Sequence, residues 1–384
     1  MKDNRRDFIK KGTSLAAALS LGAVGASASP LVSDNTVAVP AAHKVAWPVI
    51  EGPDTPKMTM NVGLNDPMSK VKAIKQFGAD YVHMAGPRLP WTKEGIQTIV
   101  DKYKAEGLTV INMMVNFSGD IIHAGSGRDE EIKRVQDAIV AAGAAGIPVV
   151  EYNFYAHRLG EGYYNVEGRG GSGYLGYDYN RVNPKTGIAP KDLPPTEREP
   201  AMKKEELWAN IAYFLKAVIP VAEKANVRLA LHPNDPPAPI SRGSEQIMKS
   251  FADWKHLFDL VDSPANGMTF DCGVSTEIGE DAVEVAKYML SRNRINHVHF
   301  RNVIVEAPST KYVETFPDNG QVNMFAVMQT LVRGKYKFGI FAEHPRANEI
   351  DKERGGDFIS YIYNQAYARG VFQSVLTLEK GYKA

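Results

Sequence analysis

Short apolar runs rich in β-branched residues alternate along most of this chain with longer stretches whose apolar residues recur at helical spacing, and this rhythm limits the folds open to it. The strand-like runs occupy residues 58–63, 80–86, 108–115, 147–154, 227–233, 267–273, 295–303 and 338–345. Eight strand–helix units are the content of a TIM barrel. A doubly wound sheet is the main alternative, but no glycine-rich phosphate turn follows the first strand. We therefore predict an α/β fold, a (β/α)8 barrel.

The N-terminal residues have the pattern of an export signal. The basic stretch "MKDNRRDFIKK" contains Arg5 and Arg6 and precedes a mildly apolar stretch that ends in small residues at positions 26–28. It resembles a twin-arginine signal peptide; a short anchor helix is the alternative, although a membrane span needs roughly 20 strongly apolar residues. We predict a signal peptide at 1–28, an N-terminal segment at 29–56, and a barrel domain at 57–384 with an insertion at about 155–200. The predicted location is periplasmic, reached by the twin-arginine route.

The composition and net charge of the chain limit the classes of partner that it is expected to bind. The formal net charge is +1, with 44% hydrophobic and 23% charged residues, which is typical of a soluble globular protein and argues against nucleic acid as a partner. We expect no stable membrane insertion of the mature chain. A small molecule is the expected partner, and the sequence leaves open whether the chain forms a homo-oligomer.

Cys272 is the only cysteine in the chain. Exported proteins usually carry cysteines in disulfide-bonded pairs, and a single cysteine cannot form an internal disulfide. Cys272 is therefore either a small buried apolar residue or a thiolate with a chemical role.

Polar residues follow the last four predicted strands at the ends where a barrel gathers its active-site loops. They are His232, Cys272, His299 with Arg301, and Glu343 with His344. Side chains alternate along a strand, so His297, His299 and Arg301 share one face. A lone histidine at a strand end is usually a satisfied polar residue, but imidazole, thiolate and carboxylate groups at four consecutive strand ends suit a divalent transition metal such as Mn²⁺ or Fe²⁺. In this interpretation Cys272 is unpaired because it binds the metal.

Four segments resemble the mannonate dehydratase family, metal-dependent sugar-acid enzymes on a xylose-isomerase-like TIM barrel. They are "YNF" (152–154), "LHPNDPP" (231–237), "TFDCG" (269–273) and "VHFRNV" (298–303). The resemblance implies metal ligands at His232, Cys272 and His299. The family's fourth ligand lies in an Asp-His-Gly-like segment, and this chain has Glu343-His344-Pro345 there, so Glu343 is the expected fourth ligand.

The resemblance also implies a reaction: dehydration of D-mannonate, or a related sugar acid, to 2-keto-3-deoxy-D-gluconate. The proton that leaves lies next to a carboxylate, so the reaction needs a metal and an arginine to stabilise the enediolate charge. The expected catalytic residues are His344, Arg301 and a tyrosine, either Tyr361 or Tyr363, of which we select Tyr361. The expected substrate-binding residues are Arg301, Asn302, Asp235, Asn153 and Arg169.

The Tyr- and Gly-rich insertion after the fourth strand is either a surface loop or a lid over the barrel mouth that brings Arg158 or Arg169 to an anionic substrate. Two other functions stay open. A metal-dependent isomerase or epimerase of the same superfamily would favour carboxylate ligands, which Glu151 and Glu343 offer. A non-catalytic sugar-acid-binding protein would bind its ligand without turnover.

Overall fold

The computed structural model describes residues 51–197 and 199–380 of the chain. The predicted signal peptide at 1–28, and all of the N-terminal segment except residues 51–56, lie outside the described residues.

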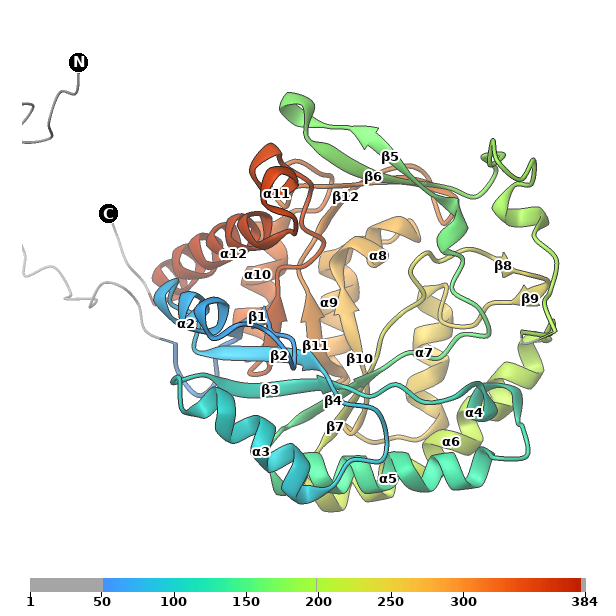
Figure 1. The fold of residues 1–384 in the computed structure, drawn as a ribbon, viewed down its shortest axis with the longest axis horizontal. Coiled ribbons are helices and arrows are strands. Elements are labelled where there is room, and N and C mark those ends of the chain that lie inside the picture. The colour runs from blue at the N-terminus through green and yellow to red at the C-terminus, as the bar shows by residue number, and fades with distance from the viewer. Residues whose placement is uncertain (1–50, 198, 381–384) are drawn as a thin grey trace, which may run out of the picture. The chain divides into compact units, whose positions relative to one another are not determined.

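Eight parallel strands close into a barrel in the order β1-β14-β11-β10-β7-β4-β3-β2, which confirms the predicted fold class (Figure 1). Their bounds are β1 Lys57–Asn61, β2 Tyr81–Ala85, β3 Thr109–Met114, β4 Val149–Tyr152, β7 Arg228–Leu231, β10 Asn266–Asp271, β11 Ile295–His299 and β14 Gly339–Phe341. Each lies within one of the predicted strand segments or overlaps it closely. Because all eight strands run parallel around the closed barrel, their carboxyl ends gather at one mouth.

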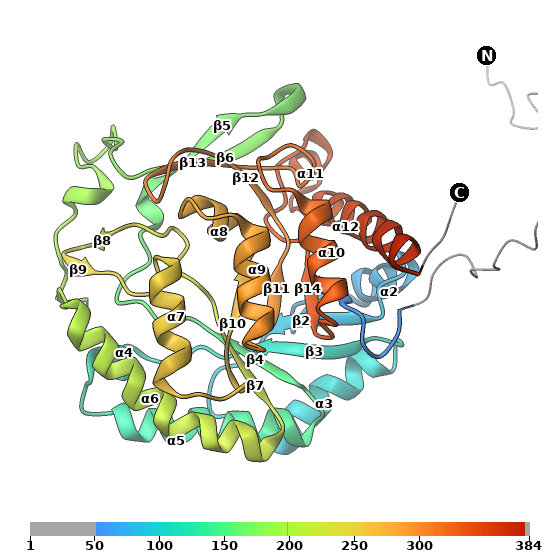
Figure 2. The same ribbon diagram turned by 180° about the vertical axis from the view of Figure 1, so that it is seen from behind.

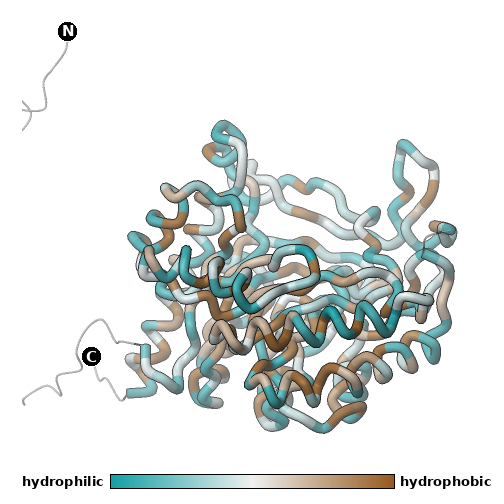
Figure 3. The backbone as a smooth tube through the Cα atoms, turned by 60° about the horizontal axis from the view of Figure 1, so that its bottom comes forward, coloured by the Kyte–Doolittle hydropathy of each residue, from teal (hydrophilic) through white to brown (hydrophobic). Residues whose placement is uncertain are grey.

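Amphipathic helices surround the barrel. The longer ones are α2 Met68–Gln76, α3 Lys93–Lys104, α5 Arg128–Ala144, α6 Lys204–Ala225, α7 Phe251–Leu260, α9 Ala282–Ser291, α10 Met324–Arg333 and α12 Phe358–Glu379; the short ones are α4 Gly119–His123, α8 Cys272–Glu277 and α11 Glu349–Arg354. Hydrophobic and hydrophilic positions alternate along the helices in Figure 3, because one face packs on the barrel and the other meets solvent. Across the described residues, none of the helices is long and apolar enough to cross a membrane.

Two insertions build a second, antiparallel sheet of order β12-β13-β6-β5. The insertion after β4 supplies β5 Tyr163–Glu167 and β6 Gly173–Asp178, with 3₁₀ turns η1 Gly160–Gly162, η2 Arg169–Gly171 and η3 Pro190–Asp192. The insertion after β11 supplies β12 Asn302–Ala307 and β13 Lys311–Thr315. Figures 1 and 2 show the two hairpins side by side beyond the barrel strands. A two-stranded hairpin, β8 Ile240–Ser241 with β9 Ser244–Glu245, follows β7.

This second sheet corrects the predicted strand at 295–303. Barrel strand β11 ends at His299, and β12 begins at Asn302 in the other sheet. The predicted run is continuous because β11 and the first two residues of β12 are all buried, so hydrophobicity alone does not reveal the change of sheet.

The barrel interior is unusually polar below the mouth. Glu151 on β4 accepts hydrogen bonds from Thr269 Oγ1 at 2.6 Å and from Asn112 Nδ2 at 3.0 Å. His83 and His297 lie in the same interior with their rings 5.6 Å apart. Because buried polar groups are costly unless they are paired, such an interior indicates a chemical rather than a purely structural purpose.

Candidate metal centre

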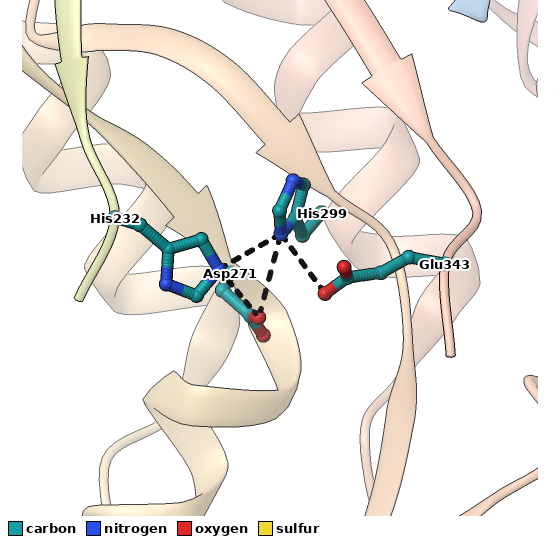
Figure 4. A group of neighbouring side chains, drawn as sticks. All are labelled: His232, Asp271, His299 and Glu343. Carbon is teal, nitrogen blue, oxygen red and sulfur yellow. Dashed lines mark hydrogen bonds and ion pairs between the residues drawn. The ribbon is translucent and has the colours of Figure 1, made fainter. Parts of the chain in front are cut away.

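Four side chains from four neighbouring strands converge at the mouth of the barrel (Figure 4). They are His232 after β7, Asp271 at the end of β10, His299 at the end of β11 and Glu343 after β14, and one donor atom of each lies within 4.8 Å of the others. His299 Nδ1 is 3.0 Å from His232 Nε2 and 2.9 Å from Glu343 Oε1. Asp271 Oδ2 is 3.9 Å from both imidazoles.

Hydrogen bonds behind the two imidazoles decide which nitrogen faces the group. His232 Nδ1 lies 2.6 Å from the carbonyl oxygen of Pro233. This oxygen can only accept a hydrogen bond, so Nδ1 carries the proton and the free lone pair of the ring is on Nε2. His299 turns Nε2 towards Glu151 Oε1 at 3.5 Å and Nδ1 towards the group. A carboxylate or carbonyl behind each ring is the usual arrangement of metal-binding histidines.

The charges of these residues are complementary. Burial works against protonation of His299, but the carboxylates of Glu343 and Glu151 outweigh it and raise its pKa to about 9. Burial and the neighbouring charge of His299 lower the pKa of His232. Burial opposes ionisation of Glu343, yet His299 and His344 hold its pKa well below the usual range. The site therefore stabilises a positive charge between its carboxylates.

The structure brings Asp271, and not Cys272, into this group. Cys272 is the first residue of α8, fully buried, and its thiol donates to the backbone carbonyls of His299 at 3.2 Å and Arg301 at 3.3 Å. Burial raises the pKa of this thiol, which disfavours a thiolate. Among the described residues, the donor group at this strand end therefore contains Asp271 and not the expected Cys272. Strand alternation contained the signal, because Thr269 faces the barrel interior and Asp271 is two residues further on.

Arg301, an expected substrate-binding residue, lies among buried carboxylates. Its guanidinium is buried and donates to Asp271 Oδ2 at 2.9 Å, Glu277 Oε1 at 2.7 Å and Asp235 Oδ2 at 3.1 Å. It also lies 3.4 Å from Glu343 Oε1. Each guanidinium nitrogen already has a carboxylate partner, and Arg301 is not among the residues that line the cavity next to the donor group.

A cavity of about 240 Å³ adjoins three of the four donor side chains, those of His232, His299 and Glu343. Its lining includes the expected residues His232, His299, Glu343, His344, Asn153 and Asp235, together with Met114, Tyr155, Arg158 and Pro233. Asp235 is held in place in this lining, because its Oδ1 accepts hydrogen bonds from Tyr163 at 2.6 Å and from Tyr312 at 3.1 Å. Tyr155 was not singled out by the sequence, which offers many tyrosines in this insertion.

Three other expected site residues lie away from this cavity. Asn302 is buried and uses its amide to donate to the carbonyls of Pro317 and Val322. Arg169 pairs with Asp318 at 2.7 Å. Tyr361 stacks on Phe341 with ring centroids 5.6 Å apart and lines a separate cavity of about 90 Å³. The alternative tyrosine, Tyr363, is exposed and accepts from Arg169 at 3.3 Å.

The donor chemistry fits a divalent metal. Two imidazole nitrogens and two carboxylates within 4.8 Å of one another form a mixed nitrogen and oxygen set, which suits first-row divalent ions, Mn²⁺ and Fe²⁺ among them. The fold and the site therefore define a (β/α)8 barrel with the donor set of a divalent-metal centre at its mouth.

Comparison with known proteins identifies the family. Residues 57–382 match the model of the D-mannonate dehydratase (UxuA) family, so the chain belongs to this family of hydro-lyases. A mannonate dehydratase from Streptococcus equi subsp. zooepidemicus is 30% identical over 338 residues, 81% of this chain and 92% of that protein. One from Enterococcus faecalis is 31% identical over 322 residues, which are 74% of this chain and 86% of that protein.

Solved structures agree with the fold. The crystal structure of mannonate dehydratase from Streptococcus suis serotype 2 matches with a TM-score of 0.73 and 26% identity, covering 85% of this chain and 97% of that one. A xylose isomerase domain protein from Alicyclobacillus acidocaldarius matches with a TM-score of 0.56 and 12% identity, covering 83% of this chain and 99% of that one, which shows the shared barrel alone.

Proposed function

We propose that this chain dehydrates D-mannonate, or a closely related sugar acid, to 2-keto-3-deoxy-D-gluconate with a divalent metal held by His232, Asp271, His299 and Glu343. The observation that carries the proposal is the cavity in which three of these ligands meet His344 and polar groups able to bind a sugar acid. Family membership supports the same reaction.

The bound metal would act as a Lewis acid that stabilises negative charge developing on the substrate carboxylate and the adjacent oxygen. We propose Mn²⁺ or Fe²⁺, and the replacement of a thiol by the Asp271 carboxylate makes the set harder and favours Mn²⁺. Arg301 keeps Asp271 oriented from behind, through the 2.9 Å bond from its Nε. Glu151 does the same for His299 from inside the barrel.

His344 is the proposed proton-transfer residue, because its imidazole lines the cavity beside Glu343. Burial works against its protonation, but Glu314 and Glu343 outweigh this and raise its pKa. Tyr155 lines the same cavity, and its hydroxyl is the proposed second proton-transfer group, in place of that of Tyr361, which lines a separate cavity. Arg158, whose Nε donates to the Asp235 carbonyl at 2.9 Å, is the proposed partner of the substrate carboxylate in place of Arg169.

Replacing His344 by Asn tests this assignment. General acid–base catalysis contributes about 10²–10⁴-fold, so turnover of D-mannonate should fall by that factor while bound metal, measured by elemental analysis, stays at the wild-type level. Unchanged turnover would remove His344 from the reaction.

A metal-dependent isomerase or epimerase is the second candidate. It is favoured by one observation: two of the four donor side chains, Asp271 and Glu343, are carboxylates. Parallel assays with Mn²⁺ separate the two. Keto-acid formation from D-mannonate supports the dehydratase, whereas conversion of a neutral ketohexose without any reaction of aldonic acids supports the isomerase or epimerase. Binding of D-mannonate without turnover would indicate a non-catalytic protein.

A further inference from the structure

The hairpin of the second insertion places one carboxylate directly behind His344. Glu314 on β13 is buried, with 1% of its surface exposed, and its Oε2 lies 2.8 Å from His344 Nδ1. The same oxygen is 2.8 Å from Arg346 Nη2. Glu314 lies in a segment to which the sequence assigned neither a strand nor a site.

The bond to Glu314 determines which face His344 offers to the cavity. An ionised carboxylate can only accept, so Nδ1 of His344 must carry the proton that it shares with Glu314. Nε2 then points the other way, 3.5 Å from Glu343 Oε2 and 3.9 Å from Asp235 Oδ2. The nitrogen that faces the cavity is therefore Nε2, in one tautomer and one ring orientation.

Glu314 is itself held firmly in place. It pairs with Val303 on β12 and with Leu175 on β6, so neighbouring strands fix its backbone on both sides. Burial would raise its pKa, but His344 and Arg346 outweigh this and lower it, so the side chain stays ionised.

We propose that Glu314 is a positioning residue, which holds His344 in the tautomer that presents Nε2 to the substrate. The inference rests on the proposed role of His344 in proton transfer. It gives the added antiparallel sheet a purpose, because β13 carries the carboxylate across the mouth of the barrel to a loop at the end of β14.

A purely structural role is the competing explanation. Arg346 Nε donates to the carbonyl of His344 at 2.9 Å, so Glu314 and Arg346 together also fasten the loop at 344–346. The two explanations differ in what happens to the imidazole itself, and the experiment must therefore report on the ring.

The first readout is the tautomer. Side-chain ¹⁵N NMR of histidine-labelled, Zn²⁺-loaded protein, recorded at a pH where the His344 ring is neutral and with its signal assigned by its loss in His344→Gln, should show the Nδ1-protonated form in the wild type. Glu314→Gln should give a mixture of tautomers. Arg346→Gln weakens the loop anchor but keeps Glu314, so it should retain the wild-type signal. Identical His344 shifts in the wild type and Glu314→Gln would overturn the proposal.

The second readout is a double-mutant cycle with D-mannonate and Mn²⁺. Glu314→Gln should lower kcat by about 10–100-fold, the usual cost of losing a partner that orients a functional histidine, with KM and bound metal nearly unchanged. In a His344→Gln background the same change should have no further effect, because the residue acts through His344. Additive losses would contradict this.

Controls separate the possible failures. Glu306→Gln removes an exposed carboxylate from the same hairpin and should leave kcat unchanged. If Glu314→Gln does not fold, Glu314→Asp keeps the charge but shortens the reach by one methylene and should lower kcat to an intermediate value. If the wild type does not dehydrate D-mannonate, the proposed function fails, whereas the NMR measurement still decides the role of Glu314.

Discussion

Replacing Arg301 by Gln should destabilise the protein more than almost any other single change at the site. The wild-type guanidinium holds Asp235, Asp271 and Glu277 through three charge-assisted hydrogen bonds of 2.7–3.1 Å, and all four side chains are buried. A neutral glutamine offers two N–H donors on one nitrogen in place of the five on the guanidinium, and it carries no positive charge. The variant therefore leaves buried negative charges close together without a cation.

The expected decrease in the free energy of unfolding follows from the loss of these three hydrogen bonds and of the positive charge. Removing one partner of a buried ion pair costs about 3–5 kcal/mol, which is a large part of the roughly 5–15 kcal/mol of a typical domain. At about 1.4 kcal/mol per tenfold change, the ratio of folded to unfolded protein should fall by roughly 10²–10⁴-fold. Urea unfolding followed by tryptophan fluorescence at pH 7.5 measures the free energy of unfolding of both proteins.

The pH dependence of the free energy of unfolding gives an independent test of this prediction. Burial opposes ionisation of Asp235, but Arg301 and His344 outweigh it and hold the pKa of Asp235 below its usual range. Without Arg301 this folded-state pKa rises, so as the pH falls the folded variant takes up a proton that the folded wild type does not. Proton uptake by the folded state stabilises it as the pH falls, so the deficit of the variant should shrink from pH 8 to pH 5.

Arg333→Gln is the matched control. Arg333 is exposed and forms a surface ion pair with Glu379 at 3.0 Å, which is worth about 0–1 kcal/mol. A loss below about 1 kcal/mol for Arg301→Gln, or a deficit equal at pH 5 and pH 8, would refute the assignment of Arg301 as the cation that organises the acidic side chains.

Further expectations concern the metal and the substrate. Asp271→Asn should lose bound metal by elemental analysis, whereas Cys272→Ser, which keeps a hydrogen-bond donor outside the donor group, should retain about one equivalent; metal loss in the serine variant would return the thiol to the site. Because the proton on His299, with a pKa of about 9, competes with the metal, calorimetry should show proton release on Mn²⁺ binding and an affinity that falls as the pH is lowered from 9 towards 6; pH-independent affinity would contradict this. Arg158→Gln should raise the KM for D-mannonate about tenfold or more, as expected for the loss of a hydrogen bond to a charged group, and Arg169→Gln should leave the KM unchanged. A raised KM in Arg169→Gln and an unchanged KM in Arg158→Gln would indicate instead that the substrate carboxylate binds at Arg169.

The barrel could be predicted from the sequence because its signal is repeated eight times. Each buried strand and each amphipathic helix carries its own periodicity, so an error in one element leaves the count intact. The sequence also predicts that His232, His299 and Glu343 lie close together, for a related reason: they stand at or just after strand ends, and the strand ends of a barrel meet at one mouth.

The exceptions have physical causes. A lone cysteine is chemically conspicuous, so the sequence draws attention to Cys272, whereas strand alternation directs Asp271 inwards and Cys272 begins α8. The contacts of Arg301 with Glu277 and Asp235 join residues far apart in the chain, so the sequence does not show them.

The contact between Glu314 and His344 shows a different limit of prediction from the sequence. It joins residues 30 positions apart through a sheet assembled from two separate insertions, and β13 pairs with β6 from the distant first insertion. Local periodicity carries no information about which inserted hairpins meet.

The most direct test is anomalous X-ray diffraction at the manganese edge from crystals of the chain grown with Mn²⁺. The account predicts one strong peak at the barrel mouth, bounded by His232 Nε2, Asp271, His299 Nδ1 and Glu343 at about 2.0–2.3 Å. A peak ligated by Cys272, or no peak among these four side chains, would contradict it.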